Sequence, residues 1–391
     1  MRHRLVEPEY SLVSNAWKKK HRTIHTGPQQ CVQQSSLNNI QKRDTENHVP
    51  TCKMAGKVTY CVIFALGICN AYSLELKQML ILSRHNLRTP LTGGLQSMSP
   101  KIWPKWEYAQ GELTEKGASL EGYLGKYFAE WMQYQGLIPD GCPEADSVFV
   151  YANTRQRCKD TAKAFVDAAF RNCSIAVNSK NTTEMDPIFN PIIHNSSEAF
   201  KEQVISEIRK KLNEIDLKDV YLELNRITNI KDSQICKEES YCDLVNDTDD
   251  IVFQIGIKPK VAGPLFIANG MVDSFLMGYY EGLPEGDVAW GEIKTDEQWN
   301  LLTRAVKGYQ NIVFNLPKSA KDFARPLVQY IKEMLSSNKT LTLLVGHDSN
   351  LNSVIAALGF KLFKLPGQLE ISPIGAKLVF QRWSDGNTIL I

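Results

Sequence analysis

The stretch MLILSRHNLRTP, residues 79–90, decides the fold of this chain. Its first four residues form an apolar run of the length expected for a buried strand, and the polar residues follow directly. A second stretch, LTLLVGHDSN at residues 341–350, repeats this arrangement far downstream. Buried strands of this kind are typical of parallel α/β sheets, in which reactive groups collect beyond the carboxyl ends of the strands. The sequence therefore predicts a single crevice where both polar stretches meet.

The two polar stretches would bring several cations and one acid together. The first supplies Arg84, His85 and Arg88, and the second supplies His347 and Asp348. Neighbouring arginines are costly to bury without an anion, and the guanidinium fork suits phosphate oxygens. Taken alone, His85 would more often be a hydrogen-bonded core residue, and Asp348 or Ser349 could simply cap a helix expected from residue 350 to 358. Together, these residues favour the handling of a phosphoryl group.

The pattern strand, loop and helix occurs three times, after Leu82, Tyr151 and Val345, and this predicts an α/β fold. Between residues 196 and 309 the pattern changes to helices joined by polar loops, which indicates a helical insertion. The helices expected from apolar periodicity cover residues 118–134, 156–170, 198–215, 220–229, 268–281 and 320–336.

These residues resemble the histidine acid phosphatase branch of the phosphoglycerate-mutase-like superfamily, whose signature is Arg-His-Gly-x-Arg-x-Pro with a later His-Asp. Asn86 takes the place of the glycine, as in the subgroup of bacterial periplasmic glucose-1-phosphatases. The similarity spans roughly residues 74–383 and includes WPKW at 103–106, VAWGEIK at 288–294 and VFQRW at 379–383. The resemblance implies a phosphoglycerate-mutase-like α/β sheet with flanking helices and an inserted helical cap domain.

The N-terminal pattern and the resemblance together suggest how the chain is divided. From the pattern we expect residues 1–53 to be a non-native extension or one low in structure, and residues 54–73 to be a signal peptide. The α/β domain would comprise residues 74–195 and 310–391, and the cap would comprise residues 196–309. Members of the family continue for some tens of residues beyond the position of Ile391, so completion of the sheet at that end is in question.

The family's catalytic roles can be carried over residue by residue. His85 would be the nucleophile that forms a phosphohistidine, and Asp348 would be the general acid, which implies an acidic pH optimum. The residues expected to bind the phosphate are Arg84, Arg88, Arg157 and His347. Arg155 matches no family position, and we expect it at the surface.

Four further residues leave alternatives open. Asn86 would either narrow or polarise the pocket, or serve as a turn residue that tolerates left-handed geometry. Trp103, Trp106 and Trp290 would either stack on a sugar ring or, more often, belong to the core. We expect no metal or other cofactor, because His-x₃-His and Cys-x₂-Cys spacings are missing from Leu74 onward and the family uses arginines instead.

Charge and hydropathy bear on the compartment. The formal net charge is +2, but from Leu74 onward 35 basic residues face 39 acidic ones, without a basic stripe for nucleic acid. The apolar stretch 58–72 ends in Ala71-Tyr72-Ser73, a pattern typical of signal peptide cleavage. We therefore expect a secreted protein, cleaved near Ser73 and without stable membrane association. The alternative is a type II membrane anchor with a basic tail.

The cysteines agree with secretion. By resemblance, Cys142 would pair with Cys173 and Cys236 with Cys242. Cys158 would remain, either buried on a helix or paired with another molecule. Glycosylation sequons occur at Asn181, Asn195, Asn246 and Asn338.

The sequence thus predicts a secreted, metal-independent acid phosphomonoesterase. Its partner would be a small-molecule phosphate monoester, in particular a sugar phosphate such as glucose 1-phosphate. The alternatives are a broad-specificity acid phosphatase or phytase, and a catalytically weak secreted protein that retains the fold.

Overall fold

The computed structural model describes residues 74–91, 93–361, 367–384 and 389–390. The expected N-terminal extension at 1–53 and the signal peptide at 54–73 lie outside the described residues.

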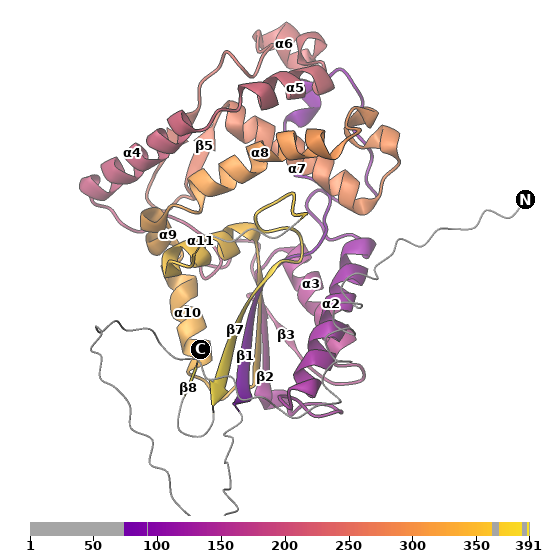
Figure 1. The fold of residues 1–391 in the computed structure, drawn as a ribbon, viewed down its shortest axis with the longest axis vertical. Coiled ribbons are helices and arrows are strands. Elements are labelled where there is room, and N and C mark those ends of the chain that lie inside the picture. The colour runs from indigo at the N-terminus through magenta and orange to yellow at the C-terminus, as the bar shows by residue number, and fades with distance from the viewer. Residues whose placement is uncertain (1–73, 92, 362–366, 385–388, 391) are drawn as a thin grey trace, which may run out of the picture. The chain divides into compact units, whose positions relative to one another are not determined.

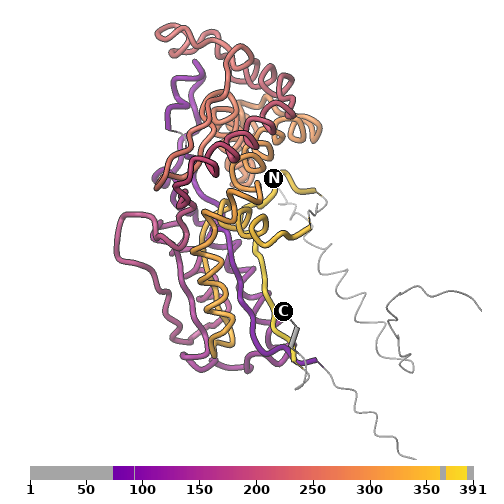
Figure 2. The backbone as a smooth tube through the Cα atoms, turned by 90° about the vertical axis from the view of Figure 1, so that its left-hand side faces the viewer, coloured from indigo at the N-terminus to yellow at the C-terminus, as the bar shows by residue number. Residues whose placement is uncertain are grey.

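A six-stranded sheet with the order β3-β2-β6-β1-β7-β8 forms the centre of the fold. Strand β6 pairs in parallel with both β1 and β2, and β3 continues the parallel part beyond β2. Strand β7 pairs antiparallel with β1, as the adjacent indigo and yellow traces show in Figure 2, and β8 pairs antiparallel with β7. The sheet is therefore extended past β1 by the C-terminal strands. The strands are β1 (Glu75–Arg84), β2 (Val148–Ala152), β3 (Val177–Asn178), β6 (Leu341–Gly346), β7 (Lys377–Ser384) and β8 (Ile389–Leu390).

Both faces of this sheet are buried, because successive side chains of a strand point to opposite sides. Leu80 and Leu82 of β1 join one apolar cluster, while Met79 and Ile81 join the other. Helices α2 and α3 lie on one side of the sheet, and α9, α10 and α11 lie on the other (Figure 1). Their bounds are α2 (Glu115–Tyr134), α3 (Gln156–Ala169), α9 (Pro317–Phe323), α10 (Arg325–Leu335) and α11 (Asp348–Leu358).

A second group of helices lies beyond the carboxyl ends of the parallel strands (Figure 1). It consists of α4 (Glu198–Glu214), α5 (Lys218–Thr228), α6 (Gln234–Glu239), α7 (Pro264–Glu281) and α8 (Asp296–Val313), together with the hairpin of β4 (Asp250–Val252) and β5 (Lys260–Ala262). Short 3₁₀ turns connect elements at η1 (Leu95–Met98), η2 (Ala145–Ser147), η3 (Ile230–Asp232), η4 (Glu285–Asp287) and η5 (Ala289–Gly291).

Two differences from the expected helices have local causes. Helix α8 was not predicted, although Thr295 caps it by accepting a hydrogen bond from the Gln298 N–H, and it runs past the expected cap boundary at 309. The single helix expected at 320–336 is two helices, α9 and α10, which meet at Ala324. Pro326 lies at the start of α10, where the missing N–H is tolerated but where a continuous helix would be interrupted.

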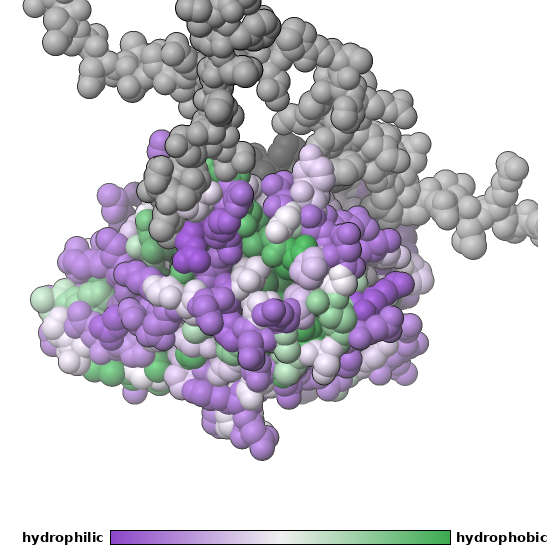
Figure 3. All heavy atoms as spheres, turned by 90° about the horizontal axis from the view of Figure 1, so that it is seen from below, coloured by the Kyte–Doolittle hydropathy of each residue, from purple (hydrophilic) through white to green (hydrophobic). Residues whose placement is uncertain are grey.

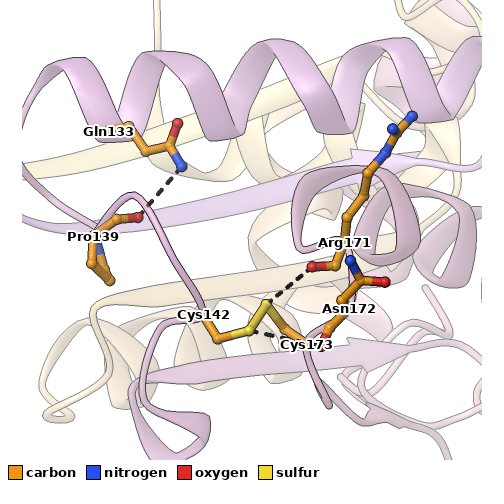
Figure 4. Close-up of a disulfide and its surroundings, with 6 residues drawn as sticks. All are labelled: Gln133, Pro139, Cys142, Arg171, Asn172 and Cys173. Atoms are coloured by element: carbon orange, nitrogen blue, oxygen red, sulfur yellow. Dashed lines mark hydrogen bonds between the residues drawn. A yellow bond between two sulfur atoms is a disulfide. The ribbon is translucent and has the colours of Figure 1, made fainter.

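The two expected disulfides are present. Cys142 is bonded to Cys173 in the loops that follow α2 and α3, as Figure 4 shows, with a Cα–Cα distance of 5.4 Å. Cys236 is bonded to Cys242 at the end of α6. Cys158 is free and buried on α3, as one of the two alternatives predicted.

The surface seen from below in Figure 3 is largely hydrophilic, with hydrophobic residues in scattered patches between the polar ones. Among the described helices, none combines the length and the apolar character needed to cross a bilayer.

Candidate active site

Three neighbouring strand ends bring the predicted residues together. Arg84 is in register with Gly346, and Ala152 is in register with Val345, so β1, β6 and β2 end at the same edge of the sheet. Beyond the ends, the His85 N–H donates to the Gly346 carbonyl over 2.9 Å. The polar residues thus leave the three strands at one common edge of the sheet, as predicted.

His85 is buried, with 3% of its surface exposed, and its ring has a defined tautomer. Nδ1 lies 2.8 Å from the carbonyl oxygen of Asn86. A carbonyl only accepts hydrogen bonds, so Nδ1 carries the proton and Nε2 keeps its lone pair. Burial, and then the charges of Arg157 and His347, hold the pKa of His85 well below its usual value. A neutral imidazole whose Nε2 lone pair is free has the protonation state that a nucleophilic attack requires.

The loop that carries His85 is held against the start of α2. The Thr114 N–H donates to the Leu87 carbonyl over 3.0 Å. A Cβ atom at Gly117 would lie 2.2 Å from the same carbonyl oxygen, so only glycine permits this approach. The close contact fixes the loop with little freedom to move.

The side chain of Asn86 holds this loop in place through hydrogen bonds, and it does not match the pocket role or the turn role considered from the sequence. Its Nδ2 donates to the buried carboxylate of Glu121 over 2.9 Å, and its Oδ1 accepts from the Leu87 N–H over 2.8 Å. Glu121 is in turn paired with Lys377 of β7 over 2.7 Å. The backbone of Asn86 is not among the positive-φ positions of the described residues, so the left-handed turn interpretation is wrong. Because the amide is directed to Glu121, we assign it to the loop and not to the pocket.

Two of the three expected phosphate-binding arginines are paired with carboxylates. Arg84 is 1% exposed and donates from Nη1 to Glu370 over 2.8 Å. Burial opposes the charge of Arg84, but Glu370 and Asp348 outweigh it and raise the pKa. Arg88 donates from Nη2 to both carboxylate oxygens of Asp273, each at 3.1 Å. These carboxylates orient the guanidinium groups.

Arg157 lies at the start of α3 and has a different environment. Its Nη1 donates to the carbonyl of Gly111 over 3.1 Å. Burial lowers its pKa to about 10, and the charge of Arg88 contributes in the same direction. The guanidinium remains protonated at any acidic or neutral pH. Arg155, two residues earlier, is exposed as expected.

Asp348 is the first residue of α11 and is partly open, with 28% of its side chain exposed. Its Oδ2 lies 3.6 Å from Nη2 of Arg84 and accepts a hydrogen bond of 3.2 Å from Gln310 of α8. Burial would raise the pKa of Asp348, but the charges of Arg84 and Lys258 outweigh it and lower the pKa. A bound phosphate dianion would offset these charges, and the carboxyl would then hold a proton more readily.

His347 faces His85 edge to face, with 5.4 Å between the ring centroids. Its Nε2 lies 2.7 Å from Nδ2 of Asn153, a donor, so the proton of the neutral ring resides on Nδ1. Burial, and then Arg157, keep the pKa of His347 low. His347 occupies the N-cap of α11, so the predicted cap at Asp348 or Ser349 is wrong by one or two residues.

Known proteins resemble the chain over most of its length. The model of the histidine phosphatase superfamily (branch 2) matches residues 75–243. The glucose-1-phosphatase of Salmonella typhimurium is 44% identical over 322 residues, which cover 80% of this chain and 78% of that protein.

The chain belongs to the histidine phosphatase superfamily. A glucose-1-phosphatase of Providencia rettgeri is 41% identical over 82% of the chain and 79% of its own length. Among solved structures, the phytase of Citrobacter braakii is 26% identical, with a TM-score of 0.73 over 81% of this chain and 84% of that one. The family and the fold expected from the sequence are therefore confirmed, and the protein is a phosphatase.

Several polar residues of this histidine phosphatase were not predicted at the site, among them Glu370 beside Arg84, Asn153 beside His347, and three residues of the helical segment. Asp273 comes from α7, Gln310 from α8, and Lys258 from the loop between β4 and β5. Asp273 is an acidic residue within an otherwise apolar stretch of α7, and this contrast is a sequence signal that could have indicated it. Gln310 and Lys258 have ordinary surroundings in the sequence, and only the approach of their elements in space reveals them.

The three tryptophans pack on one another and also border a cavity. Trp103 is stacked on Phe275 and meets Trp290 edge to face at 4.8 Å. Together with Trp106 they line a cavity of about 230 Å³ beside the segment that follows Arg88. The core interpretation is thus supported for Trp103 and Trp290, and the sugar-stacking interpretation remains a prediction. In the part of the chain that the structure describes, no group of three His, Cys, Asp or Glu residues is arranged to hold a metal ion.

Proposed function

We propose that this phosphatase hydrolyses small phosphate monoesters, sugar phosphates such as glucose 1-phosphate in particular, through a phosphohistidine on His85. The observation that carries the proposal is the Nδ1–H bond of His85 to the Asn86 carbonyl. It leaves Nε2 unprotonated among three arginines, where an attack on phosphorus is favoured.

The first step transfers the phosphoryl group. The Nε2 lone pair of His85 forms the bond to phosphorus while the bond from phosphorus to the ester oxygen breaks. Asp348, protonated when the dianion is bound, gives its proton to that oxygen, and the alcohol leaves. Arg84, Arg88, Arg157 and His347 would donate to the three other phosphate oxygens and offset the charge that develops on them.

The second step releases phosphate. The Asp348 carboxylate takes a proton from a water molecule, whose oxygen attacks phosphorus. The bond between Nε2 and phosphorus breaks, and the electron pair returns to His85. Asp348 is protonated again and ready for the next ester, which accounts for an acidic working range.

The relatives support sugar phosphates over phytate as the substrate class. Proteins named glucose-1-phosphatase are 44% and 41% identical to this chain, whereas the Escherichia coli phytase is 28% identical over a similar length. Broad acid phosphatase or phytase activity is therefore the second candidate. The close assembly of nucleophile, cations and acid argues against a catalytically weak protein.

A substrate panel with an acid-labile intermediate as the second readout tests this function. Glucose 1-phosphate, p-nitrophenyl phosphate and phytate are compared between pH 4 and 7 with EDTA present, and alkaline quenching preserves the phosphohistidine. We expect the highest kcat/KM for glucose 1-phosphate. We also expect the quenched enzyme to carry the phosphoryl group on His85. Activity without a labelled histidine would contradict the mechanism, and a preference for phytate would contradict the substrate class.

We further propose that the protein is exported and that residues 74–195 and 310–391 form one domain with 196–309 as its cap. Two disulfides support export, because they persist mainly in oxidising compartments. The sequon residues Asn181, Asn195, Asn246 and Asn338 are all exposed, which is compatible with glycosylation. N-terminal sequencing of the exported product tests the cleavage expected near Ser73.

A further inference from the structure

A cavity beside the segment that follows Arg88 has no role in the proposed mechanism. Its volume is about 230 Å³. Among the residues that line it, Pro90 and Phe275 are buried, whereas Gln110 and Asp287 are exposed and form part of its rim. Pockets for drug-sized ligands usually enclose roughly 300–1,000 Å³, so this cavity is small. It therefore suits a ligand of the size of a single sugar ring.

Aromatic side chains form much of the wall of this cavity. Trp103, Trp106 and Trp290 line it, and Tyr108 lies at its exposed edge. Tryptophan and tyrosine combine a flat apolar ring with a polar atom, so they suit ligands that have both characters. A pyranose ring is such a ligand, because its faces carry C–H groups and its edge carries hydroxyl groups. The wall therefore favours a sugar ring.

One polar atom of the wall lacks a partner. Nε1 of Trp103 is buried and has no hydrogen-bond acceptor among the described residues. Trp290 differs, because its Nε1 donates to the Ile102 carbonyl over 2.7 Å. A buried donor without an acceptor costs free energy, and an oxygen atom of a bound ligand would remove this cost. Since an indole N–H can only donate, the missing partner is an acceptor such as a hydroxyl oxygen.

The backbone that carries part of the wall is strained. Ala289 has a φ of 49° and Trp290 a φ of 55°, and both residues line the cavity. Side chains rarely adopt this left-handed region. Strained backbone is concentrated at binding and catalytic sites, where the surrounding structure holds it in place. Here it presents the Trp290 ring 4.8 Å from that of Trp103.

Charge limits what the cavity can accept. Among the described residues that line it, Asp287 is the only charged side chain. A carboxylate accepts hydrogen bonds from sugar hydroxyl groups but repels another anion. The cavity therefore disfavours a sugar phosphate and accepts the neutral sugar that remains after hydrolysis.

The cavity is next to the expected phosphate-binding residues without including them. Arg88 donates to both carboxylate oxygens of Asp273. Thr89 and Ser274, which directly follow these two residues in the sequence, line the cavity, whereas Arg88 and Asp273 are not among its described lining residues. A ligand in the cavity thus leaves the phosphate-binding residues accessible, and both sites can be occupied at the same time.

We propose that this cavity is a non-catalytic binding site for a neutral monosaccharide, separate from the active site, and that it takes the sugar released by the reaction. The identity of the sugar rests on the proposed function. The site itself rests on the aromatic wall, the unpartnered indole N–H and the charge of the cavity.

Calorimetric titration of the enzyme with D-glucose tests the proposal. We expect a Kd of roughly 1–10 mM, because a ligand with so few atoms binds weakly. The titration is repeated with the active site saturated by glucose 1-methylenephosphonate, a non-hydrolysable substrate analogue, and the Kd for glucose should not change. Glucuronate has nearly the same shape but is an anion, so it should bind at least about tenfold more weakly.

Two variants assign the binding to the cavity. Trp106→Ala should weaken glucose binding by roughly tenfold or more, because it removes one aromatic wall. Asp287→Asn should bring the affinity for glucuronate close to that for glucose. Tyr123→Ala is the matched control, since this aromatic residue of α2 is 73% exposed and does not line the cavity. It should leave both affinities unchanged.

Three outcomes would overturn the proposal. They are a lack of saturable glucose binding, displacement of glucose by the phosphonate, and unchanged affinities in both cavity variants. If Trp106→Ala fails to fold, as judged by circular dichroism, Asp287→Asn decides the last point.

Binding is measured without turnover, so this proposal and the proposed function fail separately. An enzyme that hydrolyses sugar phosphates through a phosphohistidine but does not bind glucose contradicts only the site. Glucose binding by an enzyme that hydrolyses no sugar phosphate contradicts the proposed function and leaves the site in place.

Discussion

The two sides of the active site differ in how the chain builds them. On the sheet side, Arg84 ends β1, and His85 and His347 follow directly after β1 and β6. Their positions are set by strand register, so a short motif at a strand end determines each of them. On the helical side, Asp273, Gln310 and Lys258 come from three separate elements that meet the site only through packing.

The sheet side and the helical side are therefore expected to have different roles in catalysis. The sheet side holds the proposed nucleophile and the proposed phosphate-binding cations, which every substrate would need. The helical side holds groups that orient Arg88 and tune the pKa of Asp348. Changes on the sheet side should therefore affect all substrates, and changes on the helical side should affect pH dependence and selectivity.

The largest effect is expected for His85→Ala, on the sheet side. Removing the nucleophile should lower kcat by about 10⁴-fold or more for every substrate, as for other nucleophile deletions. Circular dichroism and the unfolding transition should remain native. His194→Ala, a histidine outside the site, is the control and should keep full activity. Substantial turnover by His85→Ala would show that His85 is not the nucleophile.

Asp348→Asn should produce the next largest effect, and it should depend on the substrate. Asparagine has a similar shape but cannot donate a carboxylic proton, so phosphorylation by sugar phosphates should slow by about 10²–10⁴-fold. Aryl phosphates should slow less, because a nitrophenolate leaves without protonation. Burst kinetics measure this step separately from dephosphorylation. Equal burst-phase losses for both substrate classes would mean that Asp348 only positions the site.

Gln310→Ala tests the helical side and should shift the pH profile. The Gln310 amide stabilises the Asp348 carboxylate through a 3.2 Å hydrogen bond, so its loss should raise the pKa of Asp348. The alkaline limb of the pH profile for kcat should move to higher pH, and kcat at the optimum should fall by roughly tenfold at most. Asn311→Ala, at an exposed neighbouring position, should leave the profile in place.

The smallest effect concerns stability and not activity. His85 and His347 are buried and have lowered pKa values, so below pH 6.5 the unfolded state binds protons that the folded state does not. Stability should thus fall with decreasing pH from about 6.5, by about 1.4 kcal/mol per pH unit for each histidine. Urea unfolding of His85→Gln should show this slope reduced by one histidine. An unchanged slope would mean that His85 is protonated in the folded protein.

The sequence predicted the sheet side well because its information is local. An apolar run followed by Arg84 and His85 specifies a strand, its end and the residues beyond it. The same holds for Gly346 and His347, where a Cβ atom at Gly346 would come within 2.5 Å of the Asn350 side chain. The disulfides and the third arginine, Arg157, were reached through resemblance to a family, since spacing alone does not define a partner.

The remaining features depend on contacts that no local pattern encodes. Asn86 was expected either in the pocket or at a left-handed turn, but its side-chain amide donates instead to Glu121, which is paired with Lys377. Lys258 is one of many lysines in polar loops, and its place next to Asp348 follows from the path of the β4–β5 loop. Helix α8 is different, because its cap at Thr295 and its apolar periodicity are local signals that the sequence does contain.

The position of β6 between β1 and β2 also governs when this enzyme can acquire activity. On the ribosome, β1 and β2 emerge early, yet their shared neighbour is made only after the whole helical segment. Until then both strands present unpaired edges, which are templates for aggregation. The nascent chain therefore carries its proposed nucleophile long before it can use it, and protection of these edges during synthesis becomes a requirement of the fold.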